Sequence, residues 1–272
     1  MERLGKLESL GGWIAVAAFT VFSAMVADTA LAASITDTKH NLGTTGTGSN
    51  HLTAGTSEVC VFCHTPHGSG VGNAPLWNKN IPSTAYTLYG ATGGESASLD
   101  GTVTTVGSVS AACLSCHDGT QAMDNLINAP GSGGYNAGGA RPSGWTWTGV
   151  GADGLMPAGI TNLSSDLRND HPIGVQYCGG GLSDTGSGTC NDPDFNAIST
   201  AVIGALNQFW VDTTGGTAGT REKGDMILYR RTAGFGPSVE CGSCHDPHNS
   251  TNPTFLRVAN ASSNLCLSCH VK

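Results

Sequence analysis

The chain has 272 residues, of which 40 are glycine, 12% are charged and 6% are aromatic. Its net charge is −8 at pH 7 with lysine and arginine scattered rather than clustered, so no nucleic-acid partner is expected. A chain with so few large apolar side chains has little to offset its ordering entropy, so either much of it is disordered or another group fills the core.

The first 32 residues resemble a secretory signal peptide. Arg3 and Lys6 precede an apolar run from Trp13 to Val26, and Ala30–Ala32 resembles a small-residue cleavage site. The run is about 14 residues long, which is short for a bilayer span, so a retained membrane anchor is the weaker alternative. We therefore expect an exported mature chain, residues 33–272, with no membrane span after signal cleavage.

The first pair of chemical motifs lies at 60–117. Its two C-x-x-C-H motifs consist of Cys60, Cys63 and His64 and of Cys113, Cys116 and His117. In this motif both sulfurs form thioethers to a porphyrin, and the histidine that follows ligates the iron. The range therefore predicts two covalent haem c groups, each with a proximal histidine ligand.

A Gly-rich insertion, residues 118–240, follows the first pair. Its Cys178 and Cys190 belong to no C-x-x-C-H motif, and in an exported protein we expect them to form a disulfide. Closing a loop of this size is worth about 3 kcal/mol in the chain-entropy model. A redox-active thiol pair is the alternative.

Over 194–210, apolar residues recur at helical spacing, which predicts one longer amphipathic helix with a structural role.

The second pair of motifs lies at 241–270. Its two motifs consist of Cys241, Cys244 and His245 and of Cys266, Cys269 and His270. Residues 60–67 and 241–248 share the longer pattern C-x-x-C-H-x-P-H, and in each pair C-L-S-C-H follows. The sequence therefore predicts four haem c groups in two pairs within one domain, 33–272.

Zinc is the main alternative for these cysteines, because two C-x-x-C pairs can form a ribbon with four thiolate ligands. A ribbon has no use for histidine after every second cysteine, and export places the thiols in an oxidising compartment. Four haems would also supply the missing apolar core. We therefore expect a mostly irregular chain with short α-helices at the motifs, wrapped around four covalent haems, with little β-sheet.

His67 and His248 each follow a motif histidine by three residues. Side chains three apart on a helical turn lie on one side, about 5 to 6 Å apart, whereas the second axial ligand of an iron lies on the opposite porphyrin face. We therefore expect each of them to be the distal ligand of a haem attached elsewhere in the chain. A surface histidine is the alternative.

Four haems need four distal ligands to be six-coordinate, and five histidines remain. They are His40, His51, His67, His171 and His248. We expect His40, His67, His171 and His248 to be distal ligands, with His51 as the spare histidine or an inter-subunit ligand, although the reverse assignment of His40 and His51 stays open. All-histidine ligation leaves no open position on iron, which favours an electron carrier over a catalyst.

These motifs resemble the doubled C-x-x-C-H multihaem c-type cytochromes, and most closely the OmcE-type tetrahaem extracellular nanowire cytochromes. The resembling segments are TKHNL, VCVFCHTPHG, CLSCHDGT, DHPIGV, CGSCHDPHN and LRVANASSNLCLSCH. The resemblance implies export, stacked bis-histidine haem pairs and head-to-tail polymerisation into conductive extracellular filaments. It also implies that one haem takes its distal histidine from the adjacent protomer, for which we expect the arm with His40 and His51 to be responsible.

The leading hypothesis is therefore a tetrahaem cytochrome that is not an enzyme, polymerises with itself and exchanges electrons with other redox proteins or extracellular acceptors. The alternative is a monomeric periplasmic shuttle in which every distal ligand is intramolecular. A third hypothesis, a multihaem enzyme such as a nitrite or hydroxylamine converter, would require a five-coordinate iron.

Overall fold

The computed structural model describes residues 34–69, 74–90, 99–131, 133–213, 215–231 and 234–271. The expected signal peptide, residues 1–32, lies outside these ranges. All described residues belong to one unit, Ala32–Lys272. None of the helices formed in the described ranges is long and apolar enough to cross a bilayer.

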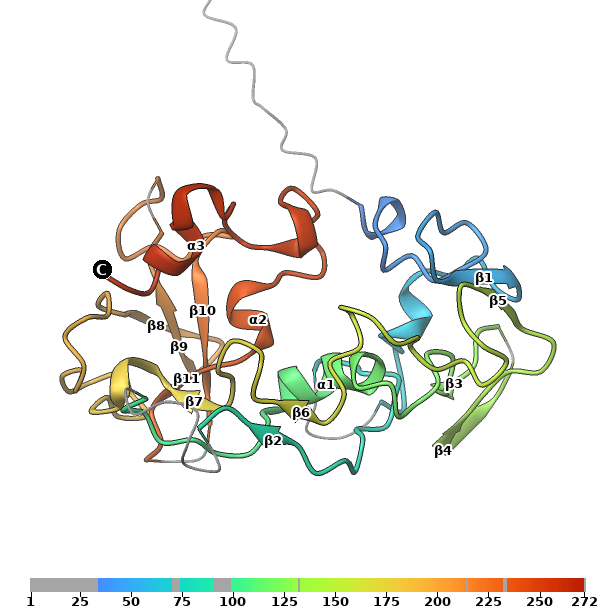
Figure 1. Cartoon of the computed structure of the whole chain (residues 1–272), viewed down its shortest axis with the longest axis horizontal. Helices are drawn as coiled ribbons and strands as arrows, with labels where there is room; N and C mark the ends of the chain where they lie inside the picture. The colour runs from blue at the N-terminus through green and yellow to red at the C-terminus, as the bar shows by residue number, and fades with distance from the viewer. Residues whose placement is uncertain are drawn as a thin grey trace, which may run out of the picture. The chain divides into compact units, whose positions relative to one another are not determined.

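The four motifs lie on short helical turns (Figure 1). α1 (Ser108–His117) carries the second motif, α2 (Cys241–Cys244) begins the third, and α3 (Asn264–Leu267) overlaps the fourth. The first motif begins on a 3₁₀ turn, η2 (Cys60–Phe62). Since residues i and i+3 lie on the same face of such a turn, each motif presents both sulfurs on one side.

The largest sheet is antiparallel and has the strand order β7-β11-β10-β9-β8. Its strands are β7 (Val175–Gln176), β8 (Ser199–Ile203), β9 (Leu206–Val211), β10 (Met226–Arg230) and β11 (Pro237–Val239). Phe209 of β9 and Leu228 of β10 are buried against Tyr177 in one apolar cluster. Because β11 ends two residues before α2, this sheet positions the third motif directly.

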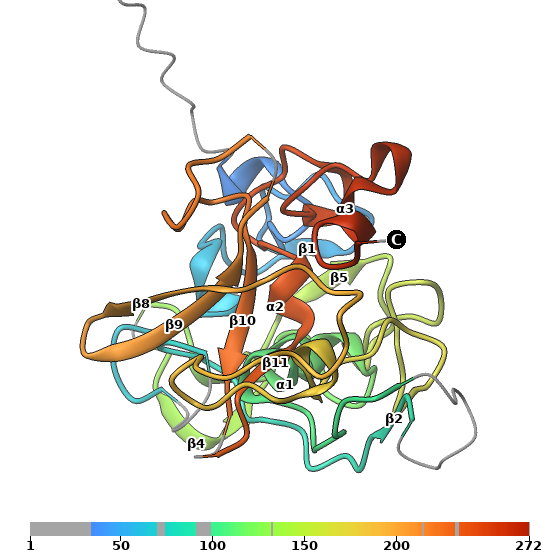
Figure 2. The same cartoon turned by 90° about the vertical axis from the view of Figure 1, so that its left-hand side faces the viewer.

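The predicted helix over 194–210 is wrong, because β8 and β9 form a hairpin there (Figure 2). Gly204 and Ala205 have φ values of +58° and +65°, as a two-residue type I′ turn requires. Threonine, valine and isoleucine in β8 favour a strand over a helix. The hairpin tip is apolar and exposed, with 71% of Val202 and 53% of Leu206 accessible to solvent.

Three small two-stranded sheets lie outside the large sheet, and two of them join segments that are distant in the sequence. They pair β1 (His51–Ala54) with β5 (Thr146–Thr148), β2 (Thr87–Leu88) with β6 (Asp166–Leu167), and β3 (Leu126–Asn128) with β4 (Tyr135–Ala140). The remaining turns of 3₁₀ helix are η1 (Ile35–Asp37), η3 (Tyr177–Gly179), η4 (Pro253–Phe255) and η5 (Ala261–Ser263). The expectation of a chain wrapped around four haems stays a prediction.

Cys178 and Cys190 form the disulfide that the sequence predicts. Cys178 is buried in the apolar cluster of the large sheet, and Cys190 packs against the same cluster. The bond therefore fastens the loop before β8 to the sheet, which is a structural role.

Candidate haem sites

Cysteines of neighbouring motifs approach one another. Cys113 and Cys241 share a side-chain hydrogen bond that raises the pKa of Cys113 and lowers the pKa of Cys241. Burial raises the pKa of Cys63 to about 12, and Cys116 of the second motif makes a smaller contribution. Burial also raises the pKa of Cys269 to about 12, with a smaller contribution from Cys244 of the third motif. Cysteines of successive motifs thus lie near one another. Cys60 and Cys266 are exposed, whereas the other six motif cysteines are partly buried, which suits an apolar porphyrin edge. Within the described ranges, no three His, Cys, Asp or Glu side chains converge in a way that could hold a metal ion.

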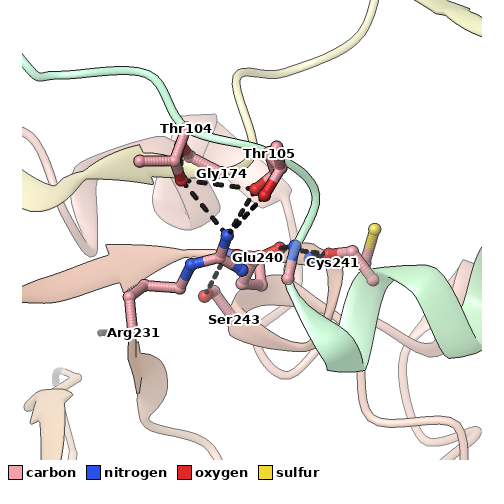
Figure 3. A network of polar contacts seen from close by, with 9 residues as sticks. Thr104, Thr105, Gly174, Arg231, Glu240, Cys241 and Ser243 are labelled. Atoms are coloured by element: carbon pink, nitrogen blue, oxygen red, sulfur yellow. Dashed lines mark hydrogen bonds and ion pairs between the residues drawn. The ribbon is translucent and has the colours of Figure 1, made fainter. Parts of the chain in front are cut away.

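A buried carboxylate joins the second and third motifs (Figure 3). Glu240 is 2% exposed and caps α2, where its backbone N–H donates to Ser243 Oγ at 3.0 Å. Its Oε2 accepts from Ser110 Oγ of α1 at 2.6 Å and from the Gly107 backbone N–H at 3.2 Å. Its Oε1 accepts from Arg231 Nη1 at 2.9 Å. One side chain therefore fixes the starts of both helices.

Three motif histidines have one ring nitrogen fixed by a backbone carbonyl. Nδ1 lies 2.9 Å from the Pro75 oxygen in His64, 2.7 Å from the Thr161 oxygen in His117, and 2.8 Å from the Thr254 oxygen in His245. A carbonyl only accepts, so Nδ1 carries the hydrogen and Nε2 keeps its lone pair. This is the arrangement of a metal-ligating histidine, and the residues therefore fit haem iron.

His248 lies opposite His64. Their ring centres are 6.0 Å apart, and their planes differ by 21°. A histidine nitrogen lies about 2 Å from a metal that it ligates, so two imidazoles on opposite sides of one metal have ring centres about 6 Å apart. The spacing of the two rings suits the proximal and distal ligands of one iron.

His40 lies beside His117 at a similar spacing, with ring centres 6.2 Å apart and planes at 63°. His40 also stacks on Phe255 at 4.4 Å and hydrogen-bonds the backbone of Pro247. Burial, followed by the nearby His117, lowers the pKa of His40 to about 4. The ring is therefore neutral at physiological pH, as a metal ligand must be.

In the part of the chain that the structure describes, His171 and His270 are linked only through their charges. Burial is the main cause that lowers the pKa of His171, and the charge of His270 contributes. His270 pairs with Phe195 through the backbone, and their ring centres are 4.3 Å apart. Phe195 thus holds the fourth motif against the segment that leads into the large sheet.

His67 and His51 are placed differently. His67 is exposed, whereas His51 lies in β1 with Nδ1 2.7 Å from the Gly48 oxygen. In the described part of the chain, neither ring makes a ring contact with a motif histidine. His245 likewise makes no ring contact with another histidine among the described residues.

Asn78 supports the first motif and has no signal in the sequence. It is fully buried, its backbone N–H donates to the Cys63 carbonyl at 2.9 Å, and its Nδ2 donates to the Val61 carbonyl at 2.7 Å. Its side chain also exchanges two hydrogen bonds with the backbone of Asn128, which is 50 residues away. Only tertiary structure reveals this role.

The attachment motifs and the imidazoles held in the ligating tautomer are the features expected of covalent haem c sites. Residues 237–272, which contain the third and fourth motifs, match the family described as Doubled CXXCH motif. The match supports a multihaem c-type cytochrome with covalently bound haem iron. No curated protein matches the chain.

Proposed function

We propose that the protein is a tetrahaem c-type cytochrome that carries electrons through bis-histidine haems. The observation that carries this proposal is the position of two non-motif histidines, His40 and His248, whose ring centres each lie about 6 Å from that of a motif histidine. When bound, each haem supplies a one-electron Fe(III)/Fe(II) couple. The chain would supply two imidazoles to each iron, and an iron ligated in this way would have no site for a substrate. The protein is therefore an electron carrier rather than an enzyme.

The fourth ligand pair is His67 with His245. The first and third motifs share the pattern C-x-x-C-H-x-P-H, and the last histidine of the third motif lies beside the motif histidine of the first. The reciprocal contact would bring the last histidine of the first motif to His245. His51 then remains as the spare histidine or as a ligand offered to a second copy.

Histidine substitution tests this assignment. In the purified holo-protein, His67→Ala is expected to leave one haem without a distal ligand, which adds a high-spin ferric signal and a cyanide-binding haem. His51→Ala is the matched control and is expected to keep four low-spin haems. A high-spin signal in His51→Ala and none in His67→Ala would reverse the assignment.

We further propose that the protein is exported to the cell surface and is the subunit of a homopolymeric, electron-conducting filament. The resemblance in the motifs and flanking segments supports this role. The exposed apolar tip of the β8–β9 hairpin, on the edge strand of the large sheet, offers a surface that a second copy would cover. Such a head-to-tail contact forms an open polymer when it does not close into a ring.

The alternative is a monomeric periplasmic shuttle that passes electrons between other redox proteins. Electron microscopy of secreted material, with sedimentation of the purified protein, separates the two. Filaments with a repeating haem-containing subunit are expected. A monomer that keeps four low-spin haems at all concentrations would favour the shuttle.

A further inference from the structure

Lys79 follows a short segment that lines the first motif. The Pro75 carbonyl fixes His64, Trp77 meets the ring of His64 edge-on at 5.8 Å, and Asn78 donates to the Cys63 carbonyl. Lys79 is the next residue, and its side chain is 0% exposed. A lysine is almost never fully buried unless its charge is met by partners.

The partners of Lys79 determine its protonation state. Its Nζ donates to the carbonyl oxygens of Ala122 at 3.0 Å, Met123 at 3.0 Å and Asn125 at 3.1 Å. Three acceptors need three N–H groups, which the ammonium has and the neutral amine lacks. The geometry therefore requires a charged lysine, stabilised by three carbonyl dipoles.

No carboxylate forms an ion pair with Lys79 within the described ranges. Asp124 lies between two of the residues whose carbonyls accept from Lys79, but its own charge is met by Arg141 at 2.6 Å. Trp147 Nε1 also donates to the Asp124 carboxylate at 3.0 Å. Among the described residues, the Lys79 ammonium is therefore met by carbonyl dipoles and not by a carboxylate, and its side chain is fully buried.

The field of this charge reaches the first motif. The backbone N–H of Asn78, the residue directly before Lys79, donates to the carbonyl of Cys63 at 2.9 Å. The sulfur of Cys63 is a point of porphyrin attachment, so the haem bound there would lie within the same field. Reduction of ferric to ferrous haem removes one positive charge, and a nearby fixed cation favours that change.

We propose that Lys79 is a potential-setting residue, whose buried ammonium raises the reduction potential of the haem on the first motif above that of an otherwise equal haem. This inference rests on the proposed function. Lys79 acts through its charge and does not contact the iron.

The test is a spectroelectrochemical titration of the purified holo-protein, in which an electrode supplies the electrons and the curve is fitted to four one-electron steps. Lys79→Gln is expected to weaken the electron affinity of one haem about tenfold, which is about 59 mV for a one-electron couple. Lys79→Arg keeps the charge and is expected to leave all four midpoints within about twofold. Because a buried charge is poorly screened, the effect is expected to persist at high salt.

Lys39→Gln is the matched control, since Lys39 is exposed and its charge is screened. Its effect is expected to be small and to vanish at high salt. Unchanged midpoints in a fully loaded Lys79→Gln protein would overturn the inference, as would an equal fall in Lys79→Arg. If Lys79→Gln does not retain four haems, Lys79→Met removes the charge instead: a tenfold fall in the electron affinity of one haem supports the inference, and unchanged midpoints overturn it.

Haem stoichiometry distinguishes failure of this inference from failure of the proposed function. Fewer than four haems in the unmutated protein, measured by the pyridine haemochrome assay, would refute the tetrahaem proposal itself. Four haems whose midpoint potentials do not change when the charge at position 79 is removed would refute only the role of Lys79.

Discussion

The first and third motifs share one sequence pattern but are held in opposite ways. The first begins on the 3₁₀ turn η2 and is supported by an irregular segment that contains Asn78 and the buried cation Lys79. The third begins on α2, directly after a strand of the large sheet, and is supported by the buried anion Glu240. The two motifs therefore have the same attachment chemistry, but a buried cation lies near the first and a buried anion near the third.

This difference shows that the motif and its surroundings determine different properties of a haem site. The five-residue motif specifies where a porphyrin is attached and which ring faces its iron. The charge near that iron comes from segments far away in the sequence. Two haems with the same ligands are thus expected to have different potentials, because potential depends on nearby charge and burial as well as on ligand identity.

The largest expected loss of stability is that of Glu240→Ala, which removes the buried anion beside the third motif. It removes the shared cap of α1 and α2 and leaves the guanidinium of Arg231, 14% exposed, without its partner. Breaking a buried pair from one side costs about 3–5 kcal/mol. Urea unfolding monitored by circular dichroism measures the loss. Glu58→Ala, at an exposed glutamate, is the control and is expected to change stability by less than about 0.5 kcal/mol. Equal losses in the two variants would contradict the bracing role of Glu240.

Asn78→Ala tests the support of the first motif and is expected to lower the free energy of unfolding less than Glu240→Ala does. It leaves buried backbone groups of Val61 and Asn128 without partners, at a cost of about 2 kcal/mol. Asn80→Ala is the matched control two residues further on. The same unfolding experiment measures both variants. Destabilisation by Asn80→Ala that equals the loss in Asn78→Ala would show that the hydrogen bonds of Asn78 are not what supports the motif.

The smallest effect is a pH dependence at Glu240. Burial raises the pKa of Glu240, and Ser110 and Arg231 only partly oppose that shift. A carboxyl whose pKa is higher in the folded protein favours folding when protonated, and this contribution is lost as pH rises through the raised pKa. The stability difference between the wild-type protein and Glu240→Gln is therefore expected to fall as pH rises above the ordinary glutamate range. Unfolding in urea from about pH 4 to about pH 8 would measure it, and parallel stability curves would contradict it.

Local features could be predicted from the sequence. The C-x-x-C-H motifs are complete within five residues, so spacing alone specifies their chemistry. The disulfide followed because Cys178 and Cys190 were the two cysteines left over. Ligand counting predicts that saturation of four irons needs four further imidazoles, but it does not tell which histidine lies beside His64 or His117.

Long-range features could not be predicted. Lys79 meets carbonyls 43 to 46 residues away, and Glu240 meets Ser110 across 130 residues, so neither role leaves a local pattern. The β8–β9 hairpin was missed because the apolar spacing over 194–210 also fits a helix. Gly204 at its centre was the available signal, since a two-residue turn requires left-handed backbone geometry there.

The carbonyl contacts of the motif histidines have a magnetic consequence. The anchors of His64, His117 and His245 lie 11, 44 and 9 residues away along the chain, so loops outside the motifs dictate how each imidazole is rotated about its bond to the metal. Ring planes at 21° in one candidate pair and at 63° in another would give the two low-spin ferric centres different g-anisotropies. A change in the loop that displaces the Thr161 backbone carbonyl would thus alter one paramagnetic resonance signal while every covalent attachment stays intact.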